Sequence, residues 1–292
     1  MRKLCLIVNP NAGGGRTAKA LPEVEQALRL HQLEYRVELT RSIEHAIELA
    51  KEATQRGEVS VSYGGDGLAG AVAHALRGTD GILGVLPGGR GNDFARKLAI
   101  PTDPAPAAEI LAHADPRTVD VAEVDGRTYL GIASYGFDSD CQDLANATTV
   151  VKGQLVYVYS ALRTLAAWKP AKLSFSADGG EERTITGYAV AACNSGVFGG
   201  GMALAPDASM EDGLLDVALT LDSSKLNYVR GIPKVFKGTH LEDPSFELFR
   251  ARELRVDAER PFRIYADGDP IGTLPATIRA VPGALRVLAP AG

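Results

Sequence analysis

The feature that most constrains this chain is a regular alternation of short apolar runs and amphipathic segments, which continues to about residue 113. Residues 3–9 form a short apolar run, and segments 35–39, 58–63 and 81–86 also have the pattern of strands. Segments 17–30, 42–55, 68–76 and 92–98 have helical spacing, and Ser42 is placed to cap the second. Strand and helix in this order predict a parallel sheet with helices on both faces. Such sheets bind ligands at the carboxyl ends of their strands, where the glycine-rich segments of this chain fall.

After Pro101, Pro104 and Pro106 the pattern changes from alternating elements to successive strands. Strand-like runs occur at 118–124, 128–134, 172–176, 184–193, 214–221, 253–256, 262–265 and 285–288, and Asp178-Gly179-Gly180 has the composition of a hairpin turn. Successive strands are typical of a mostly antiparallel domain. We therefore expect an α/β plus β fold with a parallel-sheet, Rossmann-like domain over 1–118 and a mostly antiparallel β-sandwich domain over 119–283.

Composition excludes several functions. The net charge of −5 argues against non-specific binding of nucleic acid, which requires a basic face. No stretch approaches the roughly 20 apolar residues that cross a bilayer, and the first ten residues lack the pattern of a signal peptide. Cys5, Cys141 and Cys193 are widely spaced, which favours reduced thiols over a disulfide or metal site. We expect a cytoplasmic protein without its own membrane anchor.

Residues 138–168 have the pattern of two helices set between the strands. The second carries six apolar side chains at helical spacing, at Leu155, Val158, Tyr159, Leu162, Leu165 and Ala166. Such a helix is expected to pack on its own sheet. An alternative is a helix that faces a membrane or lines a pocket for acyl chains, and Trp168 beside Lys169 and Lys172 would suit an interface.

Three glycine-rich loops follow strands of the first domain and fall at one edge of its predicted sheet. Glycine permits close approach to the backbone, and amide groups at a helix start attract phosphate. A strand-to-helix turn explains one such loop, but three at one edge favour a nucleotide site, although the first lacks P-loop spacing. The candidate binding residues are Asn9, Asn11, Gly13, Gly14, Gly15 and Arg16 in the first loop, Gly64, Gly65, Asp66 and Gly67 in the second, and Arg90 and Gly91 in the third.

Two aspartates in these loops are candidates for phosphoryl-transfer chemistry. Asp66 lies within Gly-Gly-Asp-Gly, and a carboxylate there would repel phosphate unless it holds a cation or accepts a proton. Phosphoryl transfer needs both functions, with Mg²⁺ to neutralise the phosphates and a carboxylate near the nucleophile. Asp93 in the third loop is a second candidate, although an acid at a helix N-terminus is also favoured by the helix dipole.

These loops, with segments of the second half, resemble the diacylglycerol kinase catalytic family, which includes bacterial soluble lipid kinases and sphingosine kinases. The resemblance rests on N-P-N-A-G-G-G, G-G-D-G and P-G-G-R-G-N-D-F-A-R in the first half, and on residues 199–216, 267–269 and 282–287. It covers nearly the whole chain. Gly-Gly-Asp-Gly alone is shared with NAD kinases and phosphofructokinases, so the later segments carry the distinction.

The resemblance implies ATP as the cofactor, bound in the first domain by Asn11, glycines 13–15, Thr40 and the 65–71 loop. It implies Asp66 and Asp93 in the network around the catalytic metal and the hydroxyl group, and Asp269 as the proton acceptor. It also implies a structural Mg²⁺ held by Asp212 with the backbone carbonyls of Ser209 and Leu214, although a tight acidic turn would explain the same residues. Residues 284–292 are expected to return to the first domain, and the active site to lie between the domains.

The chain departs from the family pattern at four positions. Leu68 and Ala71 stand where the family usually has Thr and Glu, Arg90 replaces a Thr, and Asp269 replaces a Glu. Arg90 carries a guanidinium that can contact phosphate in place of the lost hydroxyl, and a shorter acid at 269 can act as a base when it is correctly placed.

The predicted function is an ATP- and Mg²⁺-dependent lipid kinase, with diacylglycerol as acceptor and phosphatidic acid as product. Its partner would be a lipid at the inner membrane face, reached by reversible peripheral binding, and an exposed edge strand could support a homodimer. Two alternatives stay open. One is a kinase with a soluble acceptor, such as an NAD kinase. The other is a non-catalytic lipid- or nucleotide-binding regulator, suggested by Leu68, Ala71 and Asp269.

Overall fold

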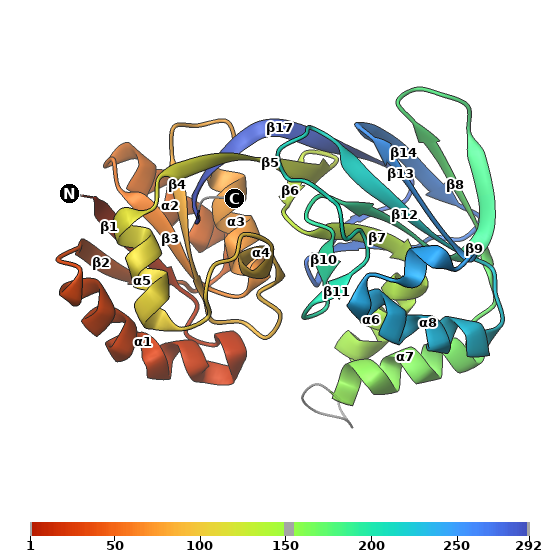
Figure 1. Ribbon diagram of the computed structural model, residues 1–292, viewed down its shortest axis with the longest axis horizontal. Helices are drawn as coiled ribbons and strands as arrows, with labels where there is room; N and C mark the ends of the chain where they lie inside the picture. Colours follow the sequence, from red (N-terminus) through yellow and green to blue (C-terminus); the bar gives the residue numbers. More distant parts are fainter. Residues whose placement is uncertain (1, 149–154, 291–292) are drawn as a thin grey trace.

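The computed structural model describes residues 2–148 and 155–290. Its first domain is built on four parallel strands, β1 (Lys3–Val8), β2 (Glu34–Leu39), β3 (Val59–Gly64) and β4 (Ile82–Pro87). Their order in the sheet is β4-β3-β1-β2 (Figure 1). Every residue of β3 and all but the first of β1 are buried, as expected for strands covered on both faces.

Helices cover both faces of this sheet, which confirms the predicted alternation. On one face α1 (Ala12–Leu30) and α5 (Pro104–His113) contribute to a core with β1 and β3, and on the other α2 (Ile43–Gln55), α3 (Asp66–Leu76) and α4 (Asp93–Lys97) contribute to a second. The Ser42 side chain accepts a hydrogen bond from the amide of His45, so it caps α2 as predicted.

Helix α5 was not predicted from the sequence. Pro104 occupies its first position, where the absent amide costs nothing, and the carboxylate of Asp103 accepts a hydrogen bond from the amide of Ala105. Pro104 and Pro106 therefore lie at the start of a helix that packs against the parallel sheet.

The second domain is a mostly antiparallel β-sandwich, as predicted. Its core gathers buried side chains from strands and from the helices α6 (Phe137–Ala147) and α7 (Leu155–Ala167), while α8 (Lys225–Lys237) packs along the same side (Figure 1). The turn at Asp178 and Gly179 joins β8 to β9 with both residues at positive φ, which confirms the predicted hairpin. The strands are β6 (Arg127–Tyr129), β7 (Ile132–Gly136), β8 (Ala171–Ala177), β9 (Arg183–Cys193), β10 (Val197–Phe198), β11 (Met202–Ala203), β12 (Leu215–Leu221), β13 (Phe246–Ala251), β14 (Glu253–Ala258), β15 (Arg263–Ala266) and β16 (Asp269–Thr273).

Two long strands, β5 (Pro116–Val124) and β17 (Ala276–Leu288), run through both domains (Figure 1). They pair with each other in antiparallel register, and β17 also pairs with β14 in the second domain and with β4 in the first. The strands of both domains, apart from β10 and β11, therefore belong to one hydrogen-bonded network.

One local prediction was wrong, and one alternative is excluded. The run 128–134 is two strands separated at Leu130 and Gly131, because the amides there bond to the carboxylate of Asp267 instead of continuing the ladder. Trp168 is only 4% exposed and stacks near Tyr188 in the core, with the Arg260 guanidinium 4.6 Å from its ring centroid. It is therefore a core residue of the second domain and not an interfacial one.

Candidate functional site

The three glycine-rich loops contact one another at the carboxyl edge of the parallel sheet. A Cβ placed on Gly13 would lie 2.7 Å from the carbonyl oxygen of Gly88, and one on Gly89 would lie 2.5 Å from the Cα of Gly65. Only glycine allows such approaches. The guanidinium of Arg16 joins the first and third loops by donating to the carbonyls of Gly13 (3.1 Å) and Gly89 (3.2 Å). The loops therefore form one continuous backbone surface.

The first loop is held in a conformation that exposes its backbone. Gly13, Gly14 and Gly15 have φ values of 60°, 75° and 87°, which glycine adopts without strain. A Cβ on Gly14 or Gly15 would meet no atom within 4 Å, so open space lies beside both residues. At the base of the loop, the side-chain oxygen of Asn9 accepts a hydrogen bond from the amide of Asn11 (3.0 Å). This arrangement can accommodate the phosphates of a nucleotide.

The third loop is shaped by Asn92, which the sequence analysis did not single out. Asn92 has a left-handed φ of 54°, and its side chain bonds both the amide (2.8 Å) and the carbonyl (3.2 Å) of Gly89. Arg96 donates to the carbonyl of Gly91 from the following helix. Arg90 is exposed and forms no ion pair among the described residues, so its guanidinium is available to a ligand.

Asp66 and Asp93 both lie beside Gly91. A Cβ on Gly91 would be 3.0 Å from a carboxylate oxygen of Asp93 and 3.2 Å from one of Asp66. Asp66 accepts a hydrogen bond from the amide of Phe94 (3.1 Å), which orients it toward the third loop. Asp93 accepts from the amide of Gly200 at 3.0 and 3.1 Å, and thereby connects the first domain to the second.

Asp269 reaches the same place from the second domain. It begins β16, and its Oδ2 lies 2.6 Å from the position that a Cβ on Gly67 would occupy. Gly67 is the neighbour of Asp66 at the N-terminus of α3. The structure therefore places all three predicted catalytic aspartates beside the glycine-rich loops, with Asp66 and Asp93 next to Gly91 and Asp269 next to Gly67.

A fourth aspartate, Asp267, anchors the segment that carries Asp269 to the backbone of residues 130–132. Its carboxylate accepts hydrogen bonds from the amides of Leu130 (2.8 Å), Gly131 (2.9 Å) and Ile132 (3.3 Å), and a Cβ on Gly131 would be 2.3 Å from Oδ1. Sequence reasoning missed this role, although the first acid of Asp-Gly-Asp was visible. Asp267 fixes the start of the turn that carries Asp269.

Burial raises the pKa of several carboxyl groups in this cluster. It raises the pKa of Asp267 to about 7, against the three amide hydrogen bonds and with a contribution from the charge of Asp66. It raises the pKa of Asp93, where Asp66 again adds to the effect. Burial also raises the pKa of Asp269, although one side of this residue stays open to solvent. Raised carboxyl pKa values at an open sheet edge are characteristic of functional sites.

The other predicted nucleotide residue, Thr40, follows β2 beside the first loop. Its amide donates to the carbonyl of Val8 (2.8 Å), the residue that precedes Asn9. Two of the departures from the family pattern fill the core: Leu68 is 4% and Ala71 is 7% exposed. Both lie on the buried face of α3, so they point away from the open side of the loops.

The residues of the predicted structural metal site lie close together in one turn, but they offer few side-chain ligands for a cation. Asp212 forms a tight turn in which Oδ1 accepts a hydrogen bond from the amide of Leu214 (3.1 Å), and Oδ2 lies 3.9 Å from the Arg250 guanidinium. The Ser209 hydroxyl accepts from the amide of Glu211. Among the described residues, no group of three or more His, Cys, Asp or Glu side chains is arranged to hold a metal. A cation here would rely on one carboxylate, backbone carbonyls and retained waters.

Asp120 is a buried support residue next to this turn that sequence reasoning also missed. Its two oxygens accept hydrogen bonds from the amides of Gly213 and Gly283, each at 2.7 Å. Gly213 belongs to the turn that carries Asp212, and Gly283 lies in the long strand β17. Asp120 therefore fastens the turn to the strands that link the domains.

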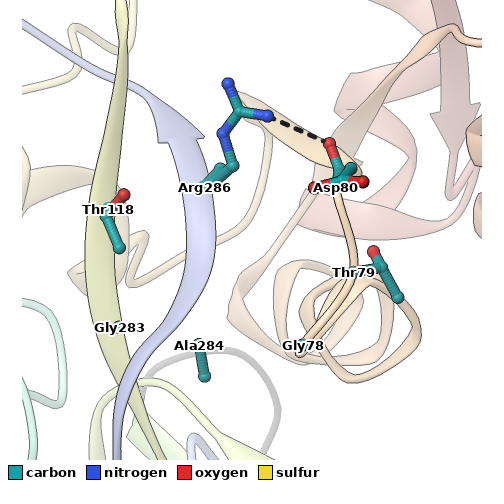
Figure 2. Close-up of a pocket in the computed structure, with 7 residues that line it drawn as sticks. All are labelled: Gly78, Thr79, Asp80, Thr118, Gly283, Ala284 and Arg286. Atoms are coloured by element: carbon teal, nitrogen blue, oxygen red, sulfur yellow. Dashed lines mark hydrogen bonds between the residues drawn. The ribbon is translucent and has the colours of Figure 1, made fainter.

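A shallow pocket of about 390 Å³ lies elsewhere, between the start of β4 and the strand β17 (Figure 2). There the amide of Gly78 donates to the carbonyl of Ala284 (2.8 Å), and Arg286 donates to the carbonyl of Asp80 (3.3 Å). This pocket is at the opposite edge of the sheet from the glycine-rich loops. Its contacts attach β17 to the first domain.

Comparison with known proteins agrees with this architecture. The diacylglycerol kinase catalytic domain matches residues 3–124, and the YegS C-terminal NAD kinase beta sandwich-like domain matches residues 131–289. The chain therefore belongs to the diacylglycerol kinase catalytic family.

Individual relatives match over nearly their whole length. A diacylglycerol kinase of Mycobacterium tuberculosis is 33% identical, over 99% of this chain and 95% of its own. A diacylglycerol kinase of Bacillus subtilis is 29% identical, over 94% of this chain and 92% of its own. A solved structure of a diacylglycerol kinase from Bacillus anthracis shares the fold, with a TM-score of 0.73 at 20% identity over 99% of this chain and 97% of that one.

Proposed function

We propose that this protein is an ATP-dependent lipid kinase that transfers the γ-phosphoryl group to the hydroxyl of diacylglycerol. One observation carries the proposal: Asp66, Asp93 and Asp269, from three segments and both domains, meet beside the contacting glycine-rich loops. Membership in the family, and relatives named diacylglycerol kinase, support the acceptor.

In this proposal the triphosphate lies along the loops. Amides of the first loop, with the guanidinium groups of Arg16 and Arg90, face the phosphate oxygens, where backbone donors and fixed cations stabilise developing charge. Thr40 and Asn11 lie beside the same loop and would contact the nucleotide. Mg²⁺ bound with ATP would neutralise phosphate charge when present, and Asp66 and Asp93 are the carboxylates placed to hold it.

Asp269 is proposed as the proton acceptor. As the lipid hydroxyl oxygen bonds to the γ-phosphorus, the bond from that phosphorus to the bridging oxygen breaks and ADP leaves. The hydroxyl proton passes to Asp269, and its raised pKa brings it closer to the range in which a carboxylate is an effective base. Asp267 acts through its hold on the 130–132 amides, so it is a positioning residue.

Asp212 is proposed to hold a structural Mg²⁺ with the carbonyls of Ser209 and Leu214. Calorimetric titration of Mg²⁺ into the wild type and into Asp212→Asn tests this directly, without any assay of turnover. Equal binding by the two proteins would place the cation elsewhere.

The test of the function is transfer of labelled phosphate from ATP, with Mg²⁺, to a panel of lipids in mixed micelles and to NAD. We expect transfer to diacylglycerol that is lost in Asp66→Asn and in Asp269→Asn. Asp257→Asn, at an exposed position on β14, serves as the matched control and should retain activity. Transfer to NAD instead would identify a kinase with a soluble acceptor, and ATP binding without any transfer would identify a regulator.

A further inference from the structure

Helix α8 leaves a continuous apolar stripe uncovered on the outside of the second domain. Its packed face uses Tyr228, which stacks on Tyr188 at 4.3 Å, together with the buried Gly231 and Val235. The remaining apolar side chains are exposed: Leu226 by 59%, Val229 by 38%, Ile232 by 38% and Phe236 by 52%. Their spacing of three, three and four residues places them on one face of the helix.

Cations border this stripe. The sequence of α8 contains Lys225, Arg230, Lys234 and Lys237 and no acidic residue, although the whole chain carries a net charge of −5. At 100° per residue, Arg230, Lys234 and Lys237 fall on the side of the stripe away from the packed face. Within the described part of the chain, Lys234 pairs with Asp243 at 3.5 Å, whereas Arg230 and Lys237 form no ion pair.

We propose that this face of α8 is a docking surface for a bilayer that contains anionic phospholipid. The apolar stripe would enter the boundary between headgroups and acyl chains, and the bordering cations would meet the anionic headgroups. The inference rests on the proposed function, because a kinase of membrane lipids has to reach its acceptor. None of the described helices is long and apolar enough to cross a membrane.

The neighbouring helix extends the surface. Figure 1 shows α7 and α8 along the same edge of the second domain, and Lys225 donates to the carbonyl of Ala166 near the end of α7 (2.7 Å). Leu162 of α7 is 58% exposed. This hydrogen bond links the two helices, and each of them carries exposed apolar side chains.

Charge favours a bilayer over a second copy of the chain as the occupant. In a two-fold dimer the same patch would face itself, so Arg230 and Lys237 would oppose their own equivalents or their neighbours. An anionic surface instead supplies the opposite charge to each cation, at about 1 kcal/mol for each basic residue near the membrane.

The first test is co-sedimentation with vesicles of phosphatidylcholine alone and of phosphatidylcholine mixed with phosphatidylglycerol, in the absence of ATP. We expect binding to the mixed vesicles that weakens with salt, and a decrease of at least about tenfold in the partition coefficient for Phe236→Asp and for Lys237→Glu. Leu30→Asp and Lys51→Glu change an exposed apolar and an exposed basic residue of the first domain, and should bind like wild type.

Equal vesicle binding by Phe236→Asp, Lys237→Glu and the wild type would overturn the proposal. A concentration-dependent dimer in sedimentation equilibrium that Phe236→Asp abolishes would overturn it too, and would assign the stripe to a second copy.

The kinase assay separates the two proposals. If the proposed function holds, phosphate transfer to a dispersed short-chain diacylglycerol should be unchanged in Phe236→Asp, while transfer to diacylglycerol in anionic vesicles falls. If no lipid accepts phosphate but vesicle binding still depends on Phe236 and Lys237, the docking surface stands and the kinase assignment fails.

Discussion

The contact between Gly67 and Asp269 makes a specific prediction about Gly67→Ala. A Cβ at this position would lie 2.6 Å from Oδ2 of Asp269, whereas ordinary contacts of a Cβ begin near 3.4 Å. The backbone of Gly67 is not at positive φ, so alanine can adopt it without strain. The clash is therefore relieved by the carboxylate of Asp269, which must move away by about 0.8 Å. The new methyl group would displace the proposed proton acceptor without removing it.

Two opposite effects should follow from this one methyl group. A misplacement of about 1 Å in a reacting group costs about 100-fold in rate, so we expect kcat for phosphate transfer to fall roughly 50-fold. Stability should not fall with it, because Gly67 lies in the first turn of α3 and alanine is favoured over glycine in helices by at most about 1 kcal/mol.

Gly70→Ala is the matched control for this prediction. Gly70 lies one turn further along α3, and a Cβ there would meet nothing within 4 Å. It should therefore gain the same helical preference and keep its activity. The assays are steady-state transfer from ATP to diacylglycerol in mixed micelles and thermal unfolding of each variant. If Gly67→Ala is as active as Gly70→Ala, Asp269 is not the positioned base and the reasoning is refuted.

Three further predictions concern Asp267, Asp120 and Trp168. The pKa of Asp267, raised from its ordinary value near 4 to about 7, means that the folded state holds this proton more tightly than the unfolded chain does. The protonated Asp267 carboxyl group contributes fully to the free energy of unfolding below pH 4, and this contribution is lost as the pH rises through 7. In urea unfolding, the stability of the wild type relative to Asp267→Asn should therefore decrease between these two pH values. Asp120→Ala leaves the amides of Gly213 and Gly283 unpaired and should lower the free energy of unfolding by about 3 kcal/mol in the same assay, with a smaller loss in Asp120→Asn. Trp168 is the only tryptophan, so its emission should be blue-shifted and unchanged by vesicles, and Trp168→Ala should cost about 3–5 kcal/mol of stability.

The parallel domain was predictable because its signals are local. The strands of the first domain are short runs that alternate with helical segments, and the capping residue Ser42 lies directly before its helix. The interfacial alternative for Trp168 was wrong for the opposite reason. Its position next to Lys169 suggested an interface, but the packing of Phe137, Tyr188 and Arg260 around it comes from distant parts of the chain.

In the candidate site too, some residues could be predicted from the sequence and others could not. Glycine-rich loops at strand ends were visible in the sequence, and so were Asp66, Asp93 and Asp269. The supports of these residues were not visible, because Asp267 bonds amides 135 to 137 residues earlier and Asp120 bonds Gly283 at a separation of 163 residues. No local spacing rule reports contacts of this length, so the scaffold of the site required the structure.

The aspartates of the candidate site come from both domains, so the site depends on the connection between the domains. Asp66 and Asp93 belong to the first domain and Asp269 to the second, so their separation depends on how the domains are joined. β5 and β17 join them through a long antiparallel ladder whose register shifts between Val281 and Leu285, and Asp93 adds a direct bond to Gly200 across the interface. A single flexible linker would let the acids drift apart and would impose an ordering cost in every catalytic cycle. The double-stranded connection instead fixes the proposed base, Asp269, relative to the glycine-rich loops.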